Sequence, residues 1–159
     1  MLIFYSILLA LVQALTEFLP VSSSGHLILM RDFLGMDDIF FSLSFDIILH
    51  FGTLVALIVF FRKDIVKIVK DINKGKFKDS LAFKLLIATL PALIFGYLGG
   101  NLIEGSLRDS FIVSFNLVLV GIIFIYAENV SRKRKKINSL SLKDVLVIGL
   151  AQSLAFLIT

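Results

Sequence analysis

Five long stretches of apolar residues, separated by polar segments, dominate this chain of 159 residues. Each is close to the roughly 20 residues that an α-helix needs to cross the hydrocarbon core of a bilayer. Apolar residues make up 58% of the chain, whereas soluble domains contain about 45–50%. The sequence therefore predicts an all-α, polytopic membrane protein and excludes an ordinary soluble domain. The stretches are Leu2–Leu19, Phe40–Phe61, Leu81–Gly99, Phe111–Ala127 and Leu142–Thr159.

Basic residues are concentrated in two clusters, which predict the orientation of the helices. Short cytoplasmic loops are enriched in Lys and Arg, so we expect both clusters in the cytoplasm and the loop Gly100–Ser110 outside. This rule accounts for the net charge of +4 without nucleic acid, which we do not expect as a partner. Contact of these side chains with anionic membrane lipid is a further, unspecific interpretation. The clusters are Arg62, Lys63, Lys67, Lys70, Lys74, Lys76, Lys78 and Lys84, and Arg132, Lys133, Arg134, Lys135, Lys136 and Lys143.

A second, shorter apolar segment, Leu27–Leu34, follows the first stretch after a polar turn, and two arrangements fit. In one, Leu2–Leu19 crosses the membrane and Leu27–Leu34 lies on the outer surface. In the other, which we favour, residues 2–35 form a re-entrant helix pair, because Leu27–Leu34 is too short to span. Pro20 ends the first helix, since proline lacks the donor that a helix interior needs. Transmembrane helices are then expected at about residues 40–61, 81–99 and 111–128.

Polar side chains gather at the end of the first apolar stretch. Gln13 and Glu17 are four residues apart, so they share one helix face, and a carboxylate in a membrane segment is functional by default. Three serines, Gly25 and His26 follow in the polar turn. A serine there is expected to cap a helix that begins near Gly25, whose free N–H groups attract anions. Together these residues provide a carboxylate, a hydroxyl nucleophile and an imidazole that exchanges protons near neutral pH.

Each of these polar residues also has a structural interpretation. The serines and Gly25 form a cap and turn, His26 lies at the membrane interface, and Glu17 pairs with Arg31 or Arg108. Asp46 and His50 are again four residues apart, in the second long stretch. They either belong to the same cavity as Glu17 or form hydrogen bonds between packed helices.

Two short segments indicate an internal repeat. Leu11–Leu15 (L-V-Q-A-L) resembles Leu150–Leu154 (L-A-Q-S-L), 139 positions later. The predicted topology gives the two copies opposite orientations, which is typical of inverted repeats with a site between broken helices. We therefore predict the first half of an inverted-repeat fold. Residues 1–139 form the first repeat, and residues 140–159 form the first helix of a truncated second repeat.

The segment Gln13–Leu27 (Q-A-L-T-E-F-L-P-V-S-S-S-G-H-L) resembles the first signature of the undecaprenyl-diphosphate phosphatases, the bacitracin-resistance family. That signature reads [E/Q]-x-x-x-E-F-L-P-[V/I]-S-S-[S/T]-G-H. Phe45–Leu54 is similar to the family segment that follows, and Pro91 and the basic loops fall where the family has them. The resemblance extends over the whole chain.

The resemblance implies a multi-pass enzyme of the bacterial inner membrane whose active site faces outside. It implies dephosphorylation of the polyprenyl lipid undecaprenyl diphosphate to the monophosphate carrier of cell-wall synthesis, with Mg²⁺ or Ca²⁺. A transporter or flippase of a lipid phosphate is the alternative, since broken helices in inverted repeats are typical of transporters. The implied catalytic residues are Glu17, His26 and Ser23, the substrate-binding residues are Ser22, Ser24, Gly25 and Gln13, and the metal ligands are Glu17 and Gln13.

The family's second signature, P-G-x-S-R-S-G-x-T, is expected just after Leu157, where this chain has Ile158-Thr159. The phosphate-binding arginine of that signature is therefore missing, and Arg31 and Arg108 are not supported by the pattern as replacements. We expect a truncated product, a fragment or one part of a split protein. It is expected to be inactive alone, and to form homo-oligomers or to associate with a full-length copy.

Overall fold

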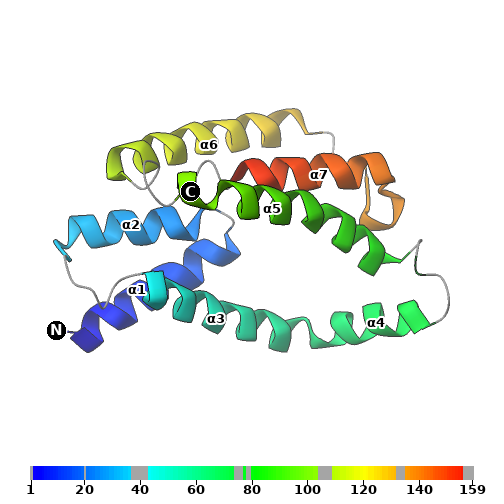
Figure 1. The fold of residues 1–159 in the computed structure, drawn as a ribbon, viewed down its shortest axis with the longest axis horizontal. Helices are drawn as coiled ribbons and strands as arrows, with labels where there is room; N and C mark the ends of the chain where they lie inside the picture. Colours follow the sequence, from blue (N-terminus) through cyan, green and yellow to red (C-terminus); the bar gives the residue numbers. More distant parts are fainter. Residues whose placement is uncertain are drawn as a thin grey trace. The chain divides into compact units, whose positions relative to one another are not determined.

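The computed structural model of the chain describes residues 2–19, 21–36, 43–73, 77, 80–103, 109–131 and 135–155 (Figure 1). Within these ranges every regular element is a helix, which confirms the predicted all-α class. Pro20, Arg108 and Ile158–Thr159 lie outside the described residues. The elements are α1 (Leu2–Phe18), α2 (Ser23–Phe33), α3 (Leu43–Phe60), α4 (Arg62–Asn73), α5 (Leu81–Ile103), α6 (Ser110–Val130), the 3₁₀ turn η4 (Ile137–Ser139) and α7 (Leu142–Ala155).

The helices match the predicted stretches, with one addition. Helices α5 and α6 extend a few residues beyond their predicted ends, and α2 begins at Ser23, slightly before the expected start near Gly25. The addition is α4, a segment that was expected to be a basic loop. Its apolar residues Ile65, Ile68 and Ile72 recur at intervals of three and four, the period of an amphipathic helix. The helix was not predicted because the many charged residues of this segment were interpreted as a polar loop.

Among the residues that the structure describes, two helices are long and apolar enough to cross a membrane. They are α5 over Leu81–Leu98 and α6 over Ser110–Val130, and α3 qualifies as a third span only when it is counted together with α4. Helix α1 is apolar but, with 17 residues, one residue shorter than the 18 residues taken for a span. Only 6% of the residues in each candidate span are buried, so their apolar side chains face outward, as lipid contact requires. The chain is a polytopic membrane protein.

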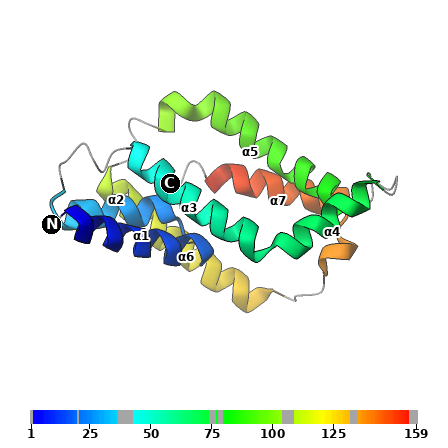
Figure 2. The same cartoon turned by 90° about the horizontal axis from the view of Figure 1, so that it is seen from below.

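The described chain divides into two compact units, each described here by itself. The first contains α1, α2, most of α3 and most of α6, from residues 1–59 and 108–126. In this unit α2 runs back beside α1, so the predicted helix–turn–helix is present (Figures 1 and 2). Its core is built on Leu9 of α1 and Leu27 of α2, both fully buried. These contacts fix α2 against α1 and thereby hold the polar turn between them.

The second unit contains α4, α5 and α7. Helices α5 and α7 lie side by side in both views (Figures 1 and 2). Gly149 of α7 permits this close approach, since a Cβ there would lie 2.5 Å from the carbonyl oxygen of Ala88 in α5. Small residues at such contacts are typical of helices that pack in membranes.

The start of α7 is fixed by a capping arrangement. The Ser141 hydroxyl accepts a hydrogen bond from the backbone N–H of Asp144 (3.3 Å), and the Asp144 carboxylate accepts from the Ser141 backbone N–H (2.9 Å). Lys135 also donates to this carboxylate (2.6 Å). The hydrogen bonds from Lys135 and Ser141 hold the pKa of the Asp144 carboxyl well below its usual range. The pair caps the orphan N–H groups of the first turn.

Replacing Gly149 with alanine is expected to destabilise the second unit by about 1–3 kcal/mol, because the added methyl group must push α5 and α7 apart. The free energy of unfolding is measured from helicity during titration of the detergent-solubilised chain with dodecyl sulfate. Gly121→Ala in α6 is the matched control, since nothing lies within 4 Å of a Cβ there. If Gly149→Ala is no less stable than Gly121→Ala, the contact between α5 and α7 is not tight in the folded protein.

Candidate functional site

The Glu17 carboxylate joins the end of α1 to the start of α2. The Ser23 hydroxyl donates a hydrogen bond to Glu17 Oε2 over 2.5 Å, and Gln13 Nε2 donates to the same oxygen over 3.2 Å. Gln13 is 1% and Ser23 7% exposed, so both hold Glu17 from the buried side. The predicted shared face of Gln13 and Glu17 is confirmed. A hydroxyl that donates to a carboxylate, with an amide holding that carboxylate in place, has the geometry that activation of a hydroxyl nucleophile requires.

Ser22 caps α2 and shapes the turn. Its hydroxyl accepts a hydrogen bond from the backbone N–H of Gly25 over 3.3 Å, which confirms the predicted serine cap. Its backbone is left-handed, with φ of 64°, a conformation that non-glycine residues seldom adopt. Gly25 is buried, and a Cβ there would lie 3.1 Å from the side chain of Val113 in α6. Ser24, which follows Ser23 in the first turn, is half-buried.

His26 and His50 both hold their Nδ1 nitrogen near the backbone carbonyl oxygen of the residue four positions earlier. Nδ1 of His26 lies 2.8 Å from the carbonyl oxygen of Ser22, and Nδ1 of His50 lies 2.7 Å from that of Asp46. A carbonyl oxygen only accepts, so Nδ1 carries the hydrogen in both rings, and Nε2 of the neutral ring is an acceptor. His50 Nε2 lies 3.9 Å from Glu17 Oε2. His50 therefore belongs to the surroundings of Glu17, one of the two interpretations that the sequence left open.

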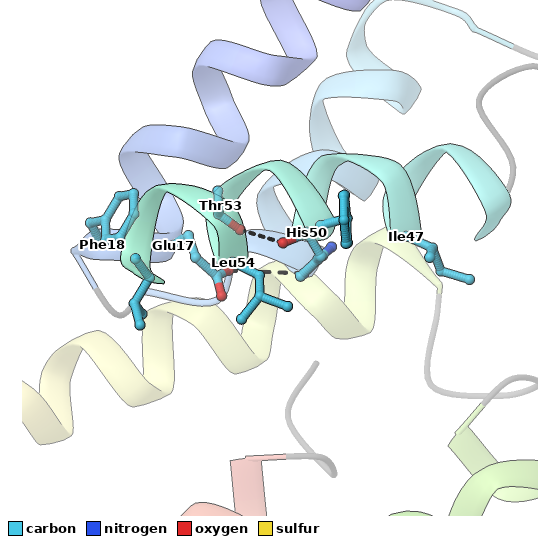
Figure 3. Close-up of a pocket in the computed structure, with 8 residues that line it drawn as sticks. Glu17, Phe18, Ile47, His50, Thr53 and Leu54 are labelled. Carbon is cyan, nitrogen blue, oxygen red and sulfur yellow. Dashed lines mark hydrogen bonds and ion pairs between the residues drawn. The ribbon is translucent and has the colours of Figure 1, made fainter. Parts of the chain in front are cut away.

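An apolar cavity of about 470 Å³ adjoins Glu17 (Figure 3). Figure 3 shows Glu17 of α1 beside His50, Thr53 and Leu54 of α3. The charged carboxylate thus lies at the edge of a largely apolar wall. Such a cavity suits a ligand with a charged head and an apolar chain. Its lining residues are Glu17, Phe18, Ile47, His50, Phe51, Thr53, Leu54 and Leu57.

Arg31 of α2 pairs with Asp46 of α3, not with Glu17. Its two terminal nitrogens bond the two carboxylate oxygens of Asp46, and the side chains are only 14% and 11% exposed. The structural interpretation in which Glu17 pairs with Arg31 is therefore wrong, and of the two interpretations of Asp46, the hydrogen bond between packed helices is confirmed. This pair was not predicted from the sequence. Arg31 and Asp46 are 15 residues apart, and only packing of α2 against α3 brings them together.

The oxygen atoms of Gln13 and Glu17 are of the type that binds a divalent cation. Gln13 Oε1 is buried and has no hydrogen-bond partner, and hard cations prefer carboxylate and amide oxygens. The described part of the chain contains no group of three or more His, Asp or Glu residues placed to hold a metal. Mg²⁺ is usually bound by one or two carboxylates together with substrate phosphates. Gln13 and Glu17 provide one amide oxygen and one carboxylate, which are ligand types that such an ion accepts.

Comparison with known proteins finds a clear set of relatives. The family model described as "Bacitracin resistance protein BacA" matches residues 6–159. The chain is 45% identical to a protein named undecaprenyl-diphosphatase from Rubrobacter xylanophilus, covering 94% of this chain and 58% of the relative. It is 41% identical to one of the same name from Saccharophagus degradans, covering 98% of this chain and 60% of the relative. The chain thus spans about three fifths of the length of these curated relatives. No solved structure matches.

Proposed function

Because the chain belongs to the family of the bacitracin resistance protein BacA, we propose that it acts in the dephosphorylation of undecaprenyl diphosphate to undecaprenyl phosphate. Two relatives that it matches over nearly its whole length are named undecaprenyl-diphosphatase. The observation that carries the proposal is the 2.5 Å hydrogen bond from the Ser23 hydroxyl to the Glu17 carboxylate. It supports Ser23 as the nucleophile and Glu17 as its base, at the start of a helix, where anions bind.

The first step is attack of Ser23 Oγ on the terminal phosphorus of the diphosphate. The hydroxyl proton passes to Glu17 Oε2, and the bond from phosphorus to the bridging oxygen breaks, so that undecaprenyl phosphate leaves with the bonding electrons. Gln13 keeps the carboxylate in position through its hydrogen bond to the same oxygen. This assignment accounts for a carboxylate that contacts a serine at the end of an apolar helix.

The second step is hydrolysis of the phosphoserine by water. His26 is the residue that takes the proton of this water, because its Nδ1 is held by the Ser22 carbonyl and its Nε2 is an acceptor. Ser24 and the N–H groups of the first turn of α2 bind the transferred phosphate, while Ser22 and Gly25 shape that turn. The bond from phosphorus to Ser23 Oγ breaks, and Glu17 returns to that oxygen the proton that it took in the first step. Inorganic phosphate then leaves with the oxygen of the water.

Glu17 and Gln13 are the residues that would hold Mg²⁺ or Ca²⁺. When bound, such an ion neutralises the negative charge of the diphosphate and of the transition state. The unpartnered, buried Oε1 of Gln13 supports this assignment. The apolar cavity beside Glu17 would receive the first part of the polyprenyl chain.

We also propose that the reaction takes place at the outer face of the bacterial inner membrane. The two basic clusters lie in the cytoplasm by the positive-inside rule. The turn between α1 and α2 then opens to the outer side if residues 2–35 form a re-entrant pair. Product released there is the carrier that cell-wall synthesis must reuse.

Release of inorganic phosphate from undecaprenyl diphosphate in reconstituted vesicles tests the proposal. The chain is assayed alone and joined to the part of the Rubrobacter relative that it does not cover, with that relative itself as positive control. We expect the joined protein to release phosphate in the presence of Mg²⁺. A folded joined protein that moves the lipid between leaflets without releasing phosphate would instead favour the transporter.

A further inference from the structure

Helix α4 presents an apolar face and basic side chains together on an exposed surface. Ile65, Val66, Val69 and Ile72 are between 36% and 52% exposed, although they form the apolar side of an amphipathic helix. Ile68 alone among its aliphatic residues is half-buried. An aliphatic face of this kind on a membrane protein indicates contact with something other than water.

The basic residues lie along one edge of this face. Lys63, Lys67 and Lys70 are spaced by four and three residues, so they form one row on the helix, and all three are exposed. Val66 and Val69 form the adjacent row. The acidic residues Asp64 and Asp71 fall on the opposite side of the lysine row, away from the valines. Val66 therefore stands next to Lys63 and Lys70, which are three and four residues from it along the helix.

The position of α4 in the chain places it where a membrane helix ends. Only Phe61 separates it from the apolar helix α3. Between Arg62 and Lys78 the sequence contains seven basic and two acidic residues. Clusters of about four to eight basic residues at the cytoplasmic end of a membrane helix or on an amphipathic helix are typical of sites for anionic lipids.

We propose that α4 lies in the headgroup layer of an anionic membrane leaflet, with its valine and isoleucine side chains inserted and its lysines on lipid phosphates. Amphipathic helices of this composition lie in the membrane plane with the apolar face at the boundary between headgroups and acyl chains. Long lysine side chains reach back to the phosphates from there. This surface is independent of the Glu17 site and would hold the cytoplasmic end of the second unit at the bilayer.

The test is the depth of spin labels on α4 in the intact chain. The sequence contains no cysteine, so Val69→Cys and Lys67→Cys each carry one label, with Val66→Cys as a second apolar position if Val69→Cys does not fold. Labelled chains are reconstituted in vesicles of phosphatidylcholine alone or mixed with phosphatidylglycerol. Collisions with oxygen, which enters the bilayer, are compared with collisions with a water-soluble nickel complex.

We expect the ratio of oxygen to nickel collisions at Val69→Cys and Val66→Cys to exceed that at Lys67→Cys several-fold in anionic vesicles. The excess should shrink in neutral vesicles and at high salt, which screens charges. Lys67→Gln/Lys70→Gln in the Val69→Cys chain should largely abolish the dependence on lipid charge, whereas the matched control Lys136→Gln/Lys143→Gln should not. Two results would overturn the proposal. One is a label at position 69 that is shielded from both reagents, because this shows a contact with protein. The other is a label at position 69 whose collision ratio is the same in anionic and neutral vesicles.

Discussion

Replacing Glu17 with glutamine is expected to lower phosphate release from undecaprenyl diphosphate by at least about 100-fold, the usual contribution of a positioned acid or base. Glutamine has nearly the same shape, so the packing of α1 against α2 is retained. Its amide oxygen still accepts the hydrogen bond that Ser23 donates, but the amide has no negative charge with which to take the proton. The measurement is the initial rate of phosphate release by the joined protein in vesicles.

Two comparisons separate this effect from a loss of folding. Asp32→Asn removes an exposed carboxylate from α2 and is expected to leave the rate unchanged. Ser23→Ala should lower the rate as much as Glu17→Gln, and the double variant should be little worse than either single one, because residues that act as a unit are not additive. If the fold-losses of the two single variants multiply in the double variant, Ser23 and Glu17 act in separate steps.

The arrangement of site residues that are close together in the sequence was predictable. Gln13 and Glu17 share a face because an α-helix repeats every 3.6 residues, and a serine cap predicts the next helix to begin near Gly25, two residues after its observed start at Ser23. The structure adds the contacts among them, such as the 2.5 Å bond from Ser23 to Glu17. The lengths of the apolar stretches likewise predicted α5 and α6 nearly to their ends.

Contacts between separate helices were not predictable in the same way. Arg31 meets Asp46, and His50 approaches Glu17, only because α3 has a particular rotation about its axis. Sequence spacing places Asp46 and His50 on one face but does not say which helix that face meets. The helix α4 is a different case. Its period was present in the sequence, but a count of charges gives the side of the membrane and not the secondary structure.

Breaking the pair of Arg31 and Asp46 is expected to cost about 3–5 kcal/mol of stability, the usual cost of leaving one member of a buried ion pair alone. The side chains are 14% and 11% exposed, so water screens the remaining charge poorly. Arg31→Met and Asp46→Leu should each lower the free energy of unfolding by this amount in dodecyl sulfate titrations. Single variants as stable as the exposed-site control Asp32→Asn would contradict this expectation.

The double variant Arg31→Met/Asp46→Leu distinguishes two roles for the pair. It removes both charges and the buried Nε of Arg31 that has no partner, so its stability should return to within about 1 kcal/mol of the original. Its rate of phosphate release should not return, because a contact between Met and Leu has no preferred direction. The Met–Leu contact therefore does not fix the rotation of α3 that places His50 beside Glu17. If stability and rate recovered together, the pair would serve only to hold α2 against α3.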